Sequence, residues 1–91
     1  MTESLLLNEL KVKVIEVLNL MDVKPDDIDP DEQLVGGRLG IDSIDVLELV
    51  IMMEKEYRLT IDNKELGAQV FASLRTMAQF IEGNLNKETA N

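Results

Sequence analysis

The sequence predicts an all-α fold, and two observations carry this expectation. Apolar residues recur at three- and four-residue steps in three separate segments, which is the pattern of a helix with one buried face. Polar residues able to cap a helix precede the later segments. With 91 residues, of which 45% are hydrophobic, the chain suits one domain over 1–91 with a modest aliphatic core and an ordered part of about 3–85.

The first helix is expected from about Thr2 or Ser4 to Met21. Its buried face is formed by Leu7, Leu10, Val14, Val17, Leu18 and Met21. Pro25, Pro30 and the glycines at 36, 37 and 40 then predict a long loop up to Asp42. Loops of this length are uncommon in compact domains unless they have a function. Apolar residues in the loop should pack it onto the helices, namely Ile28, Leu34, Val35 and Leu39.

The second helix should begin near Asp42 and end near Tyr57. The Asp42 carboxylate can cap it, and Asp45 lies in the first turn, where the helix dipole favours negative charge. Two apolar stripes run along this helix: Val46, Leu49, Val50, Met53 and Tyr57 form one, and Ile44, Leu47 and Ile51 form the other. One stripe suffices for the core, so the second is either a ridge for a partner protein, rimmed by Asp45, Glu48 and Glu54, or a second buried face.

A short extended segment, Leu59 to Ile61, precedes Asp62 and Glu65, whose spacing resembles a capping box that opens one or two helical turns. Gly67 is expected to end or bend these turns. Ser73 can cap a last helix that carries Leu74, Met77, Ala78, Ile81 and Leu85 on one face, with a frayed tail from Asn86 to Asn91. The expected interior comprises Leu10, Val14, Val17, Leu49, Val50, Met53, Phe71, Leu74, Met77 and Ile81.

Composition limits the function. The chain has no cysteine and no histidine, which excludes thiolate nucleophiles, imidazole bases and the usual zinc ligands. Its net charge of -9 repels nucleic acid and anionic membranes and favours a basic protein surface as partner. Without a basic, apolar leader or a membrane-length apolar run, the chain is expected to be cytoplasmic.

Ser43 lies where the long loop meets the second helix. A hydroxyl there is close to backbone N–H groups and a dipole that favour an attached phosphate, although serine is also an ordinary capping residue. No histidine is present to activate it as a hydrolase nucleophile.

Two other motifs fail on spacing. Asp27, Asp29 and Asp31 resemble the opening of a calcium-binding EF-hand loop, but Glu32 stands where glycine is needed and Arg38 where a bidentate glutamate is needed. The glycines at 36, 37 and 40 match neither a Walker loop nor a dinucleotide fingerprint. We therefore expect no metal site and no catalytic residue.

The segment LGIDSIDVLEL at 39–49 resembles the signature around the modified serine of acyl carrier proteins. The resemblance continues through EKEY at 54–57, Ile61, ASLRT at 72–76 and Phe80-Ile81, and covers roughly residues 5 to 83. It implies a four-helix bundle with a long first loop and a short third helix. It also implies a carrier, not an enzyme, in fatty-acid or polyketide-type biosynthesis.

The same resemblance assigns a role to Ser43, with Asp42 as part of the motif. A separate phosphopantetheinyl transferase would attach 4′-phosphopantetheine from coenzyme A to Ser43, using magnesium, and the arm would carry acyl thioesters. The implied partners are that transferase and ketosynthase, acyltransferase and reductase types of enzyme, which a monomeric carrier would meet through Ile44, Asp45, Leu47, Glu48, Ile51 and Glu54.

Three features depart from the family pattern: Gly36-Gly37-Arg38 replaces residues that are usually acidic, Lys55 interrupts the acidic run, and the stretch from Leu66 to Phe71 is long for a third helix. These departures count against a housekeeping carrier, and the form GGRLGIDSID at 36–45 is similar to that of specialised carriers in polyketide-like or aryl polyene pathways. Two alternatives remain: an unmodified acidic helical adaptor, and a peptidyl or D-alanyl carrier.

Overall fold

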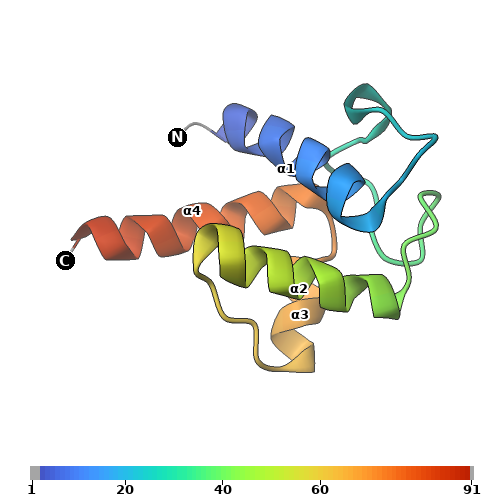
Figure 1. Cartoon of the computed structure of the whole chain (residues 1–91). Helices are drawn as coiled ribbons and strands as arrows, with labels where there is room; N and C mark the ends of the chain where they lie inside the picture. Colours follow the sequence, from blue (N-terminus) through green and yellow to red (C-terminus); the bar gives the residue numbers. More distant parts are fainter. Residues whose placement is uncertain (1–2, 91) are drawn as a thin grey trace.

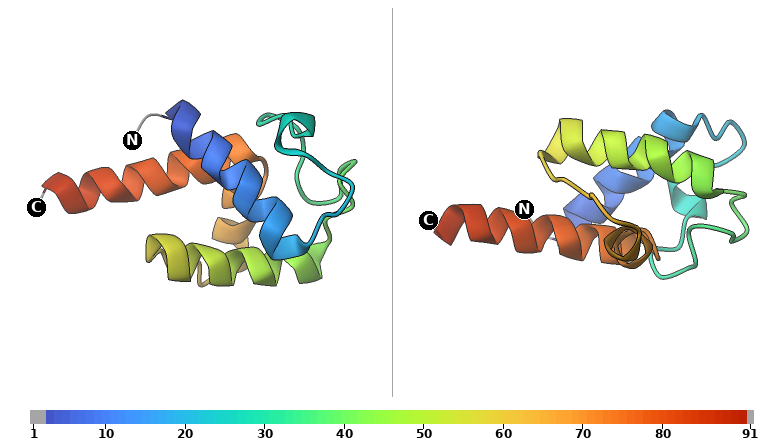
Figure 2. Two further views of the ribbon diagram at one scale, coloured as in Figure 1. Left: turned by 45° about the horizontal axis from the view of Figure 1, so that its top comes forward. Right: turned by 90° about the horizontal axis from the view of Figure 1, so that it is seen from below.

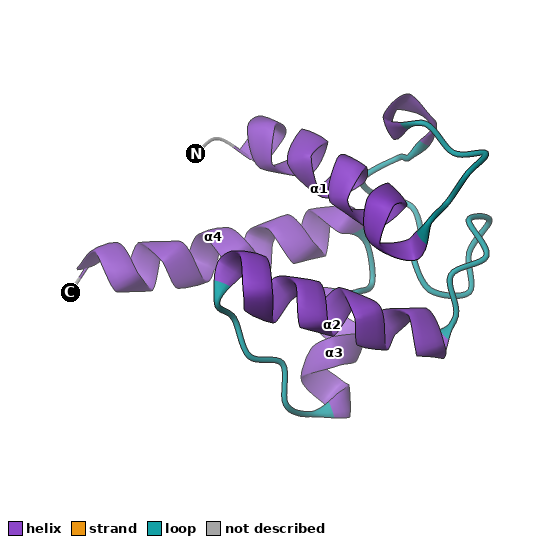
Figure 3. Ribbon diagram, in the orientation of Figure 1, coloured by secondary structure: helices purple, strands orange, loops and turns teal. Residues whose placement is uncertain are grey.

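The chain folds into four α-helices and one short 3-10 helix. The computed structural model describes residues 3–90, with side chains described through residue 84. The elements are α1 (Glu3–Leu18), η1 (Pro25–Asp27), α2 (Ser43–Tyr57), α3 (Lys64–Val70) and α4 (Leu74–Ala90). Over residues 3–90 the only β-type pairing is an isolated bridge between Val35 and Ile41, so the expected all-α bundle with a short third helix is confirmed (Figures 1 and 3).

The helices surround one aliphatic core. α1 packs on α4 and on α2, α3 packs on the start of α4, and η1 packs back against α1 (Figures 1 and 2). The expected interior is buried except for Val17 and Val50, which are half-buried at its margin, while Met52 is buried although it belongs to neither predicted stripe. None of the helices in the described part of the chain is long and apolar enough to cross a membrane.

α1 is shorter than its apolar pattern predicts. The helix ends at Leu18 because Asn19 takes a left-handed conformation with φ 54°. The Asn19 and Leu20 N–H groups then bond back to the Glu16 and Ile15 carbonyls at 3.3 and 3.0 Å, which satisfies the last turn. Met21, predicted on the buried face, is therefore outside the helix and 84% exposed.

The cap of α3 differs by one residue from the prediction. Asn63, not Asp62, is the N-cap, and its Oδ1 accepts the Leu66 N–H at 2.7 Å. Gly67 neither ends nor bends the helix, because its N–H bonds to the Asn63 carbonyl and its carbonyl accepts the Phe71 N–H within a regular turn.

The cap of α4 is the predicted one. The Ser73 hydroxyl accepts the Thr76 N–H at 3.2 Å, and the Thr76 hydroxyl accepts the Ser73 N–H at 3.0 Å. α4 continues to Ala90, so the segment 86–90, expected as a frayed tail, extends the helix.

The long loop from residue 19 to 42 is fixed to the bundle at several points. Ile28, Leu34 and Ile41 are buried in the core, and Val35 and Leu39 are partly buried. The Leu34 N–H bonds to the Ala72 carbonyl at 3.0 Å. This packing explains why so long a loop belongs to a compact domain.

Arg75, in the first turn of α4, ties three segments together. Its N–H donates to the Pro30 carbonyl at 3.0 Å, and its guanidinium bonds to Asp31 of the loop and to Glu3 of α1, both at 3.2 Å. The hydrogen bond from Arg75 lowers the pKa of the Asp31 carboxyl.

A second polar cluster joins α1 to the end of α2. Lys13 pairs with Glu56 at 2.6 Å and lies over the Tyr57 ring, while the Tyr57 hydroxyl donates to Glu9. Burial and the hydrogen bond to Glu9 raise the pKa of Tyr57, so it stays a neutral donor. The pairing with Lys13 lowers the pKa of Glu56.

Two leucines on α2 provide a matched test of this core. Leu49 is fully buried, whereas Leu47 on the opposite side is 62% exposed. We expect Leu49→Ala to reduce the free energy of unfolding by roughly 2 to 5 kcal/mol, because it leaves a cavity, and Leu47→Ala to change it by less than about 0.5 kcal/mol. Urea denaturation followed by circular dichroism measures both, and equal midpoints for the two variants would contradict this core.

Candidate functional site

Ser43 is the first residue of α2 and is exposed. Its hydroxyl forms no hydrogen bond with another residue of the described chain. Ser43 is therefore not the capping residue of α2, because the N-cap is Asp42, one residue earlier. A primary hydroxyl with no structural partner at a helix start is free to take a covalent group.

Asp42 and Asp45 hold the start of α2 between them. Asp42 Oδ1 accepts the N–H groups of Ile44 and Asp45, both at 3.0 Å, and Asp45 Oδ2 accepts the Asp42 N–H at 3.1 Å. This reciprocal capping box satisfies orphan donors on both sides of Ser43. Both carboxylates were predicted as site residues, and the structure gives them a structural role beside the serine.

The other two serines lack these features. Ser73 is buried and its hydroxyl is engaged with Thr76. Ser4 is exposed in the first turn of α1, and the residue that caps that helix lies outside the described residues. Among the serines, Ser43 is the one for which the structure describes both an exposed hydroxyl and a helix capped by another residue.

Glycines form the turn that brings the chain to Ser43. Gly36 and Gly40 have φ values of 75° and 74°, which favour glycine, and the Gly36 N–H bonds to the Ile41 carbonyl at 2.8 Å. A Cβ on Gly37 would lie 2.2 Å from the Gln33 carbonyl oxygen, so no side chain fits there.

Arg38 closes this turn from outside. Its Nε and Nη2 bond to the two carboxylate oxygens of Glu32 at 2.9 and 3.2 Å, and Nη2 also donates to the Asp27 carbonyl. The unusual Gly36-Gly37-Arg38 segment therefore has a structural function, which is to hold the loop that leads into α2.

The second apolar stripe of α2 faces solvent. Ile44, Leu47 and Ile51 are 71%, 62% and 49% exposed, so the alternative of a helix buried on two sides is wrong. Glu48 and Glu54 are also exposed beside them, whereas Asp45 is half-buried by its role in the capping box. These six residues, Ile44, Asp45, Leu47, Glu48, Ile51 and Glu54, form what we call the α2 ridge.

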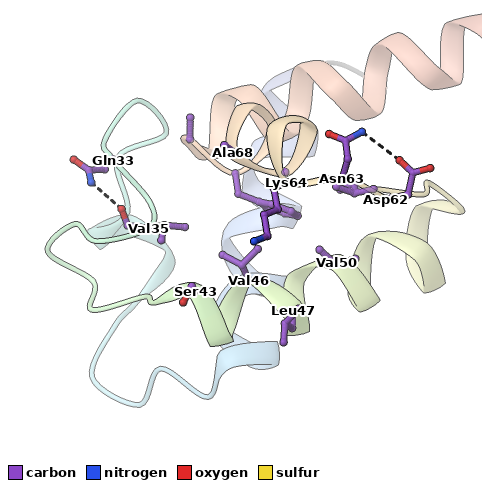
Figure 4. A pocket seen from close by; sticks show the side chains of 14 residues that line it. Gln33, Val35, Ser43, Val46, Leu47, Val50, Asp62, Asn63, Lys64 and Ala68 are labelled. Atoms are coloured by element: carbon purple, nitrogen blue, oxygen red, sulfur yellow. Dashed lines mark hydrogen bonds between the residues drawn. The ribbon is translucent and has the colours of Figure 1, made fainter.

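A groove of about 870 Å³ lies between α2 and α3 and begins at Ser43 (Figure 4). Its walls are mostly apolar, and polar side chains stand at its rim. The lining comprises Gln33, Val35, Ser43, Val46, Leu47, Val50, Ile61, Asp62, Asn63, Lys64, Gly67, Ala68, Phe71 and Ala72. The volume falls in the range of small-molecule sites.

Sequence reasoning missed this groove, because its two walls come from segments separated by the 58–63 connection. The small residues Gly67 and Ala68 on α3 were the available signal. A Cβ on Gly67 would lie 3.7 Å from the Ile61 side chain, in ordinary contact. Because glycine has no side chain, α3 takes up less space at this point of the groove lining.

The three aspartates considered as a calcium site have other partners. Asp27 accepts the Lys24 N–H at 3.0 Å, Asp29 accepts the Asp31 N–H at 2.9 Å, and Asp31 pairs with Arg75. No cluster of three or more His, Cys, Asp or Glu side chains suited to a metal ion occurs among the residues that the structure describes.

Comparison with known proteins agrees with this geometry. A family model described as the phosphopantetheine attachment site matches residues 6–81. The chain is 35% identical to an acyl carrier protein of Sulfurovum sp. (strain NBC37-1) over 77 residues, which cover 85% of the chain and 95% of that protein.

Two further relatives give the same result. Acyl carrier proteins of Wolinella succinogenes and Campylobacter hominis are 32% and 35% identical to the chain over 77 and 79 residues. The matches cover 85% and 87% of the chain and 93% and 91% of those proteins. No solved structure gave a significant match.

The capping box generates a prediction for stability. Asp42→Ala removes the acceptor for two N–H groups and should reduce the free energy of unfolding by about 1 kcal/mol, whereas Asp42→Asn, which keeps an acceptor, should cost only a few tenths. Thermal and urea denaturation of the two variants measure this difference. An alanine variant as stable as the asparagine variant would show that the cap does not hold the start of α2.

Proposed function

The chain belongs to the acyl carrier protein family, which binds phosphopantetheine, and we propose that Ser43 is the residue to which the arm is attached. The protein is a carrier of acyl intermediates and not a catalyst. Its expected covalent cofactor is 4′-phosphopantetheine. The arm supplies the thiol for acyl thioesters, which a chain without cysteine does not have.

One observation supports Ser43 above all others. Its exposed hydroxyl is unused, because Asp42 and Asp45 cap the helix around it. A phosphodiester formed on Ser43 Oγ would stand at the positive end of the α2 dipole, which favours its charge. The residues present therefore fit the group, and attachment breaks no hydrogen bond that the structure describes.

The carrier role requires contact with a phosphopantetheinyl transferase and with acyl-processing enzymes. We propose that these enzymes are of the ketosynthase, acyltransferase and reductase types and that they dock on the α2 ridge. Three exposed aliphatic side chains inside an acidic rim suit a basic surface with an apolar centre. The carrier is proposed to act as a monomer, as one domain over 1–91, in the cytoplasm.

The pathway proposed is fatty-acid or polyketide-type biosynthesis, with a specialised rather than a housekeeping role. The turn held by Gly37 and Arg38 supports this choice, since it stands where the family usually has acidic residues and its one charged side chain, Arg38, is paired with Glu32. A transferase or partner enzyme must accept this altered surface beside the serine.

Replacement of the serine tests the attachment site. Wild-type protein incubated with coenzyme A, magnesium and a broad-specificity transferase should gain the mass of one phosphopantetheine group, and Ser43→Ala should gain none. Because Ser43 forms no cap bond, the alanine variant should lose at most about 1 kcal/mol of stability. Intact-protein mass spectrometry and thermal melting make the two measurements.

Ser4→Ala is the matched control, since Ser4 is also an exposed serine near a helix start. It should gain the same mass as the wild type. An arm on the Ser43→Ala variant would refute the assignment, and a wild type that never accepts the arm would favour the unmodified adaptor.

The α2 ridge generates a prediction for binding. Glu48→Lys should slow association with a cognate acyl-processing enzyme by roughly tenfold at low salt and flatten the salt dependence, because rim charges act mainly on the encounter rate. Glu65→Lys makes the same charge change at an exposed residue of α3 that is not part of the ridge, and should alter the rate less than twofold. Stopped-flow or surface-binding kinetics at several ionic strengths measure both; equal effects would mean that net charge, not the ridge, steers partners.

A further inference from the structure

A notch lies between α1 and α2, apart from the groove at Ser43. Its volume is about 350 Å³, and it shares no lining residue with that groove. The lining comprises Lys13, Glu16 and Val17 of α1 and Glu48, Ile51, Met52, Lys55 and Glu56 of α2. Glu48 and Ile51 also belong to the α2 ridge, so the notch continues the ridge toward α1.

The ion pair between Lys13 and Glu56 sets which parts of the two helices face each other. This 2.6 Å contact joins α1 to the last turn of α2, and the two helices run in opposite directions (Figures 1 and 2). Glu16 lies about one turn further along α1, so it comes opposite the middle of α2, where Glu48 lines the same notch.

The two ends of the notch differ in charge. Lys13 neutralises Glu56, and the charge of Lys55 adds to that of Lys13 in lowering the pKa of the Glu56 carboxyl. At the other end Glu16 and Glu48 are exposed, and within the described chain neither carboxylate forms an ion pair. This end therefore offers two carboxylates, one from each helix, to a cation from outside.

The floor of the notch is apolar. Met52 is buried, Val17 is half-buried and Ile51 is exposed along one edge. A long cationic side chain gains from such a floor, because its methylene groups cover apolar surface while its charged end stays at the rim.

We propose that an arginine side chain of a partner protein binds in this notch, with its guanidinium between Glu16 and Glu48. The inference rests on the function proposed above, since the partner is an enzyme that docks on the α2 ridge. It adds α1 to the docking surface through Glu16, a residue outside the ridge.

Charge and shape together favour arginine. A guanidinium holds its N–H donors in one plane, so it can bond to two carboxylates at once and lie flat on apolar side chains. The ammonium of lysine is a compact and strongly hydrated charge that gains less from such a floor. A carboxylate from the partner would be repelled by Glu16 and Glu48.

The first measurement uses the unmodified protein and N-acetyl-arginine amide as the probe, with N-acetyl-lysine amide at the same ionic strength for comparison. Amide chemical shifts report where each probe binds. In the wild type we expect the largest shifts from the arginine probe at Val17, Ile51 and Met52, and weaker binding of the lysine probe. Glu16→Gln should weaken the arginine probe roughly threefold, as for one exposed ion pair.

The second measurement compares enzyme binding. Glu16→Gln should raise the dissociation constant of the complex with a cognate acyl-processing enzyme by a similar factor, roughly threefold. Glu65→Gln is the matched control for both measurements, because Glu65 is an exposed glutamate of α3 that does not line the notch. It should behave as the wild type.

Three outcomes would overturn the proposal. Equal weakening by Glu16→Gln and Glu65→Gln would mean that net charge alone attracts the probe. A lysine probe that binds as tightly as the arginine probe would remove the preference for a guanidinium. Enzyme binding unchanged by Glu16→Gln would exclude α1 from the docking surface. None of these results depends on an arm at Ser43, so each would leave the carrier function intact.

Discussion

The structure depends on the burial of three side chains of the long loop. Four helices, one of them with only 7 residues, share their core with this loop. Ile28, Leu34 and Ile41 belong to that core and are each no more than 1% exposed. Their burial fixes the loop, and the loop in turn fixes the point at which α2 begins. The position of Ser43 is thus a consequence of packing at some distance from it.

Charge is divided between two uses in this molecule. Three basic side chains hold parts of the fold together: Lys13 and Arg75 join segments 43 and 44 positions apart, and Arg38 joins two parts of the long loop. The surplus of acidic side chains remains on the surface, and on α2 it borders the exposed aliphatic ridge. Surface ion pairs add little stability singly. Their value here is geometric, since Lys13 joins α1 to α2, Arg75 joins α4 to α1 and to the long loop, and Arg38 closes the loop on itself.

Local signals in the sequence predicted the elements well, and α2 best of all. Its cap at Asp42, its first-turn Asp45 and its two apolar stripes all depend on residues within a few positions of one another. Helix ends were less predictable. Asn19 ends α1 by taking a left-handed conformation, which asparagine tolerates but does not require. Asp62 and Asn63 are both good caps, and only the path of the chain from Ile61 chooses between them.

Tertiary partnerships could not be predicted from the sequence. Arg75 is joined to Glu3 across 72 positions and to Asp31 across 44. The groove is lined by residues of α2, α3 and the loops, which are separate in the sequence. No local sequence pattern could therefore predict the groove or the presence of Lys64 in its lining. In the candidate site, therefore, the serine and its cap were accessible to sequence reasoning, and the surface that an attached chain would meet was not.

The capping of α2 by Asp42 has a consequence for the order of events in the life of the protein. Because no contact that forms the helix passes through the Ser43 hydroxyl, folding and modification are separable. The start of the helix is held without the arm, so a transferase that modified Ser43 would meet a folded surface. Removal of the arm would return the same native state, so a single polypeptide could be charged, stripped and charged again without refolding.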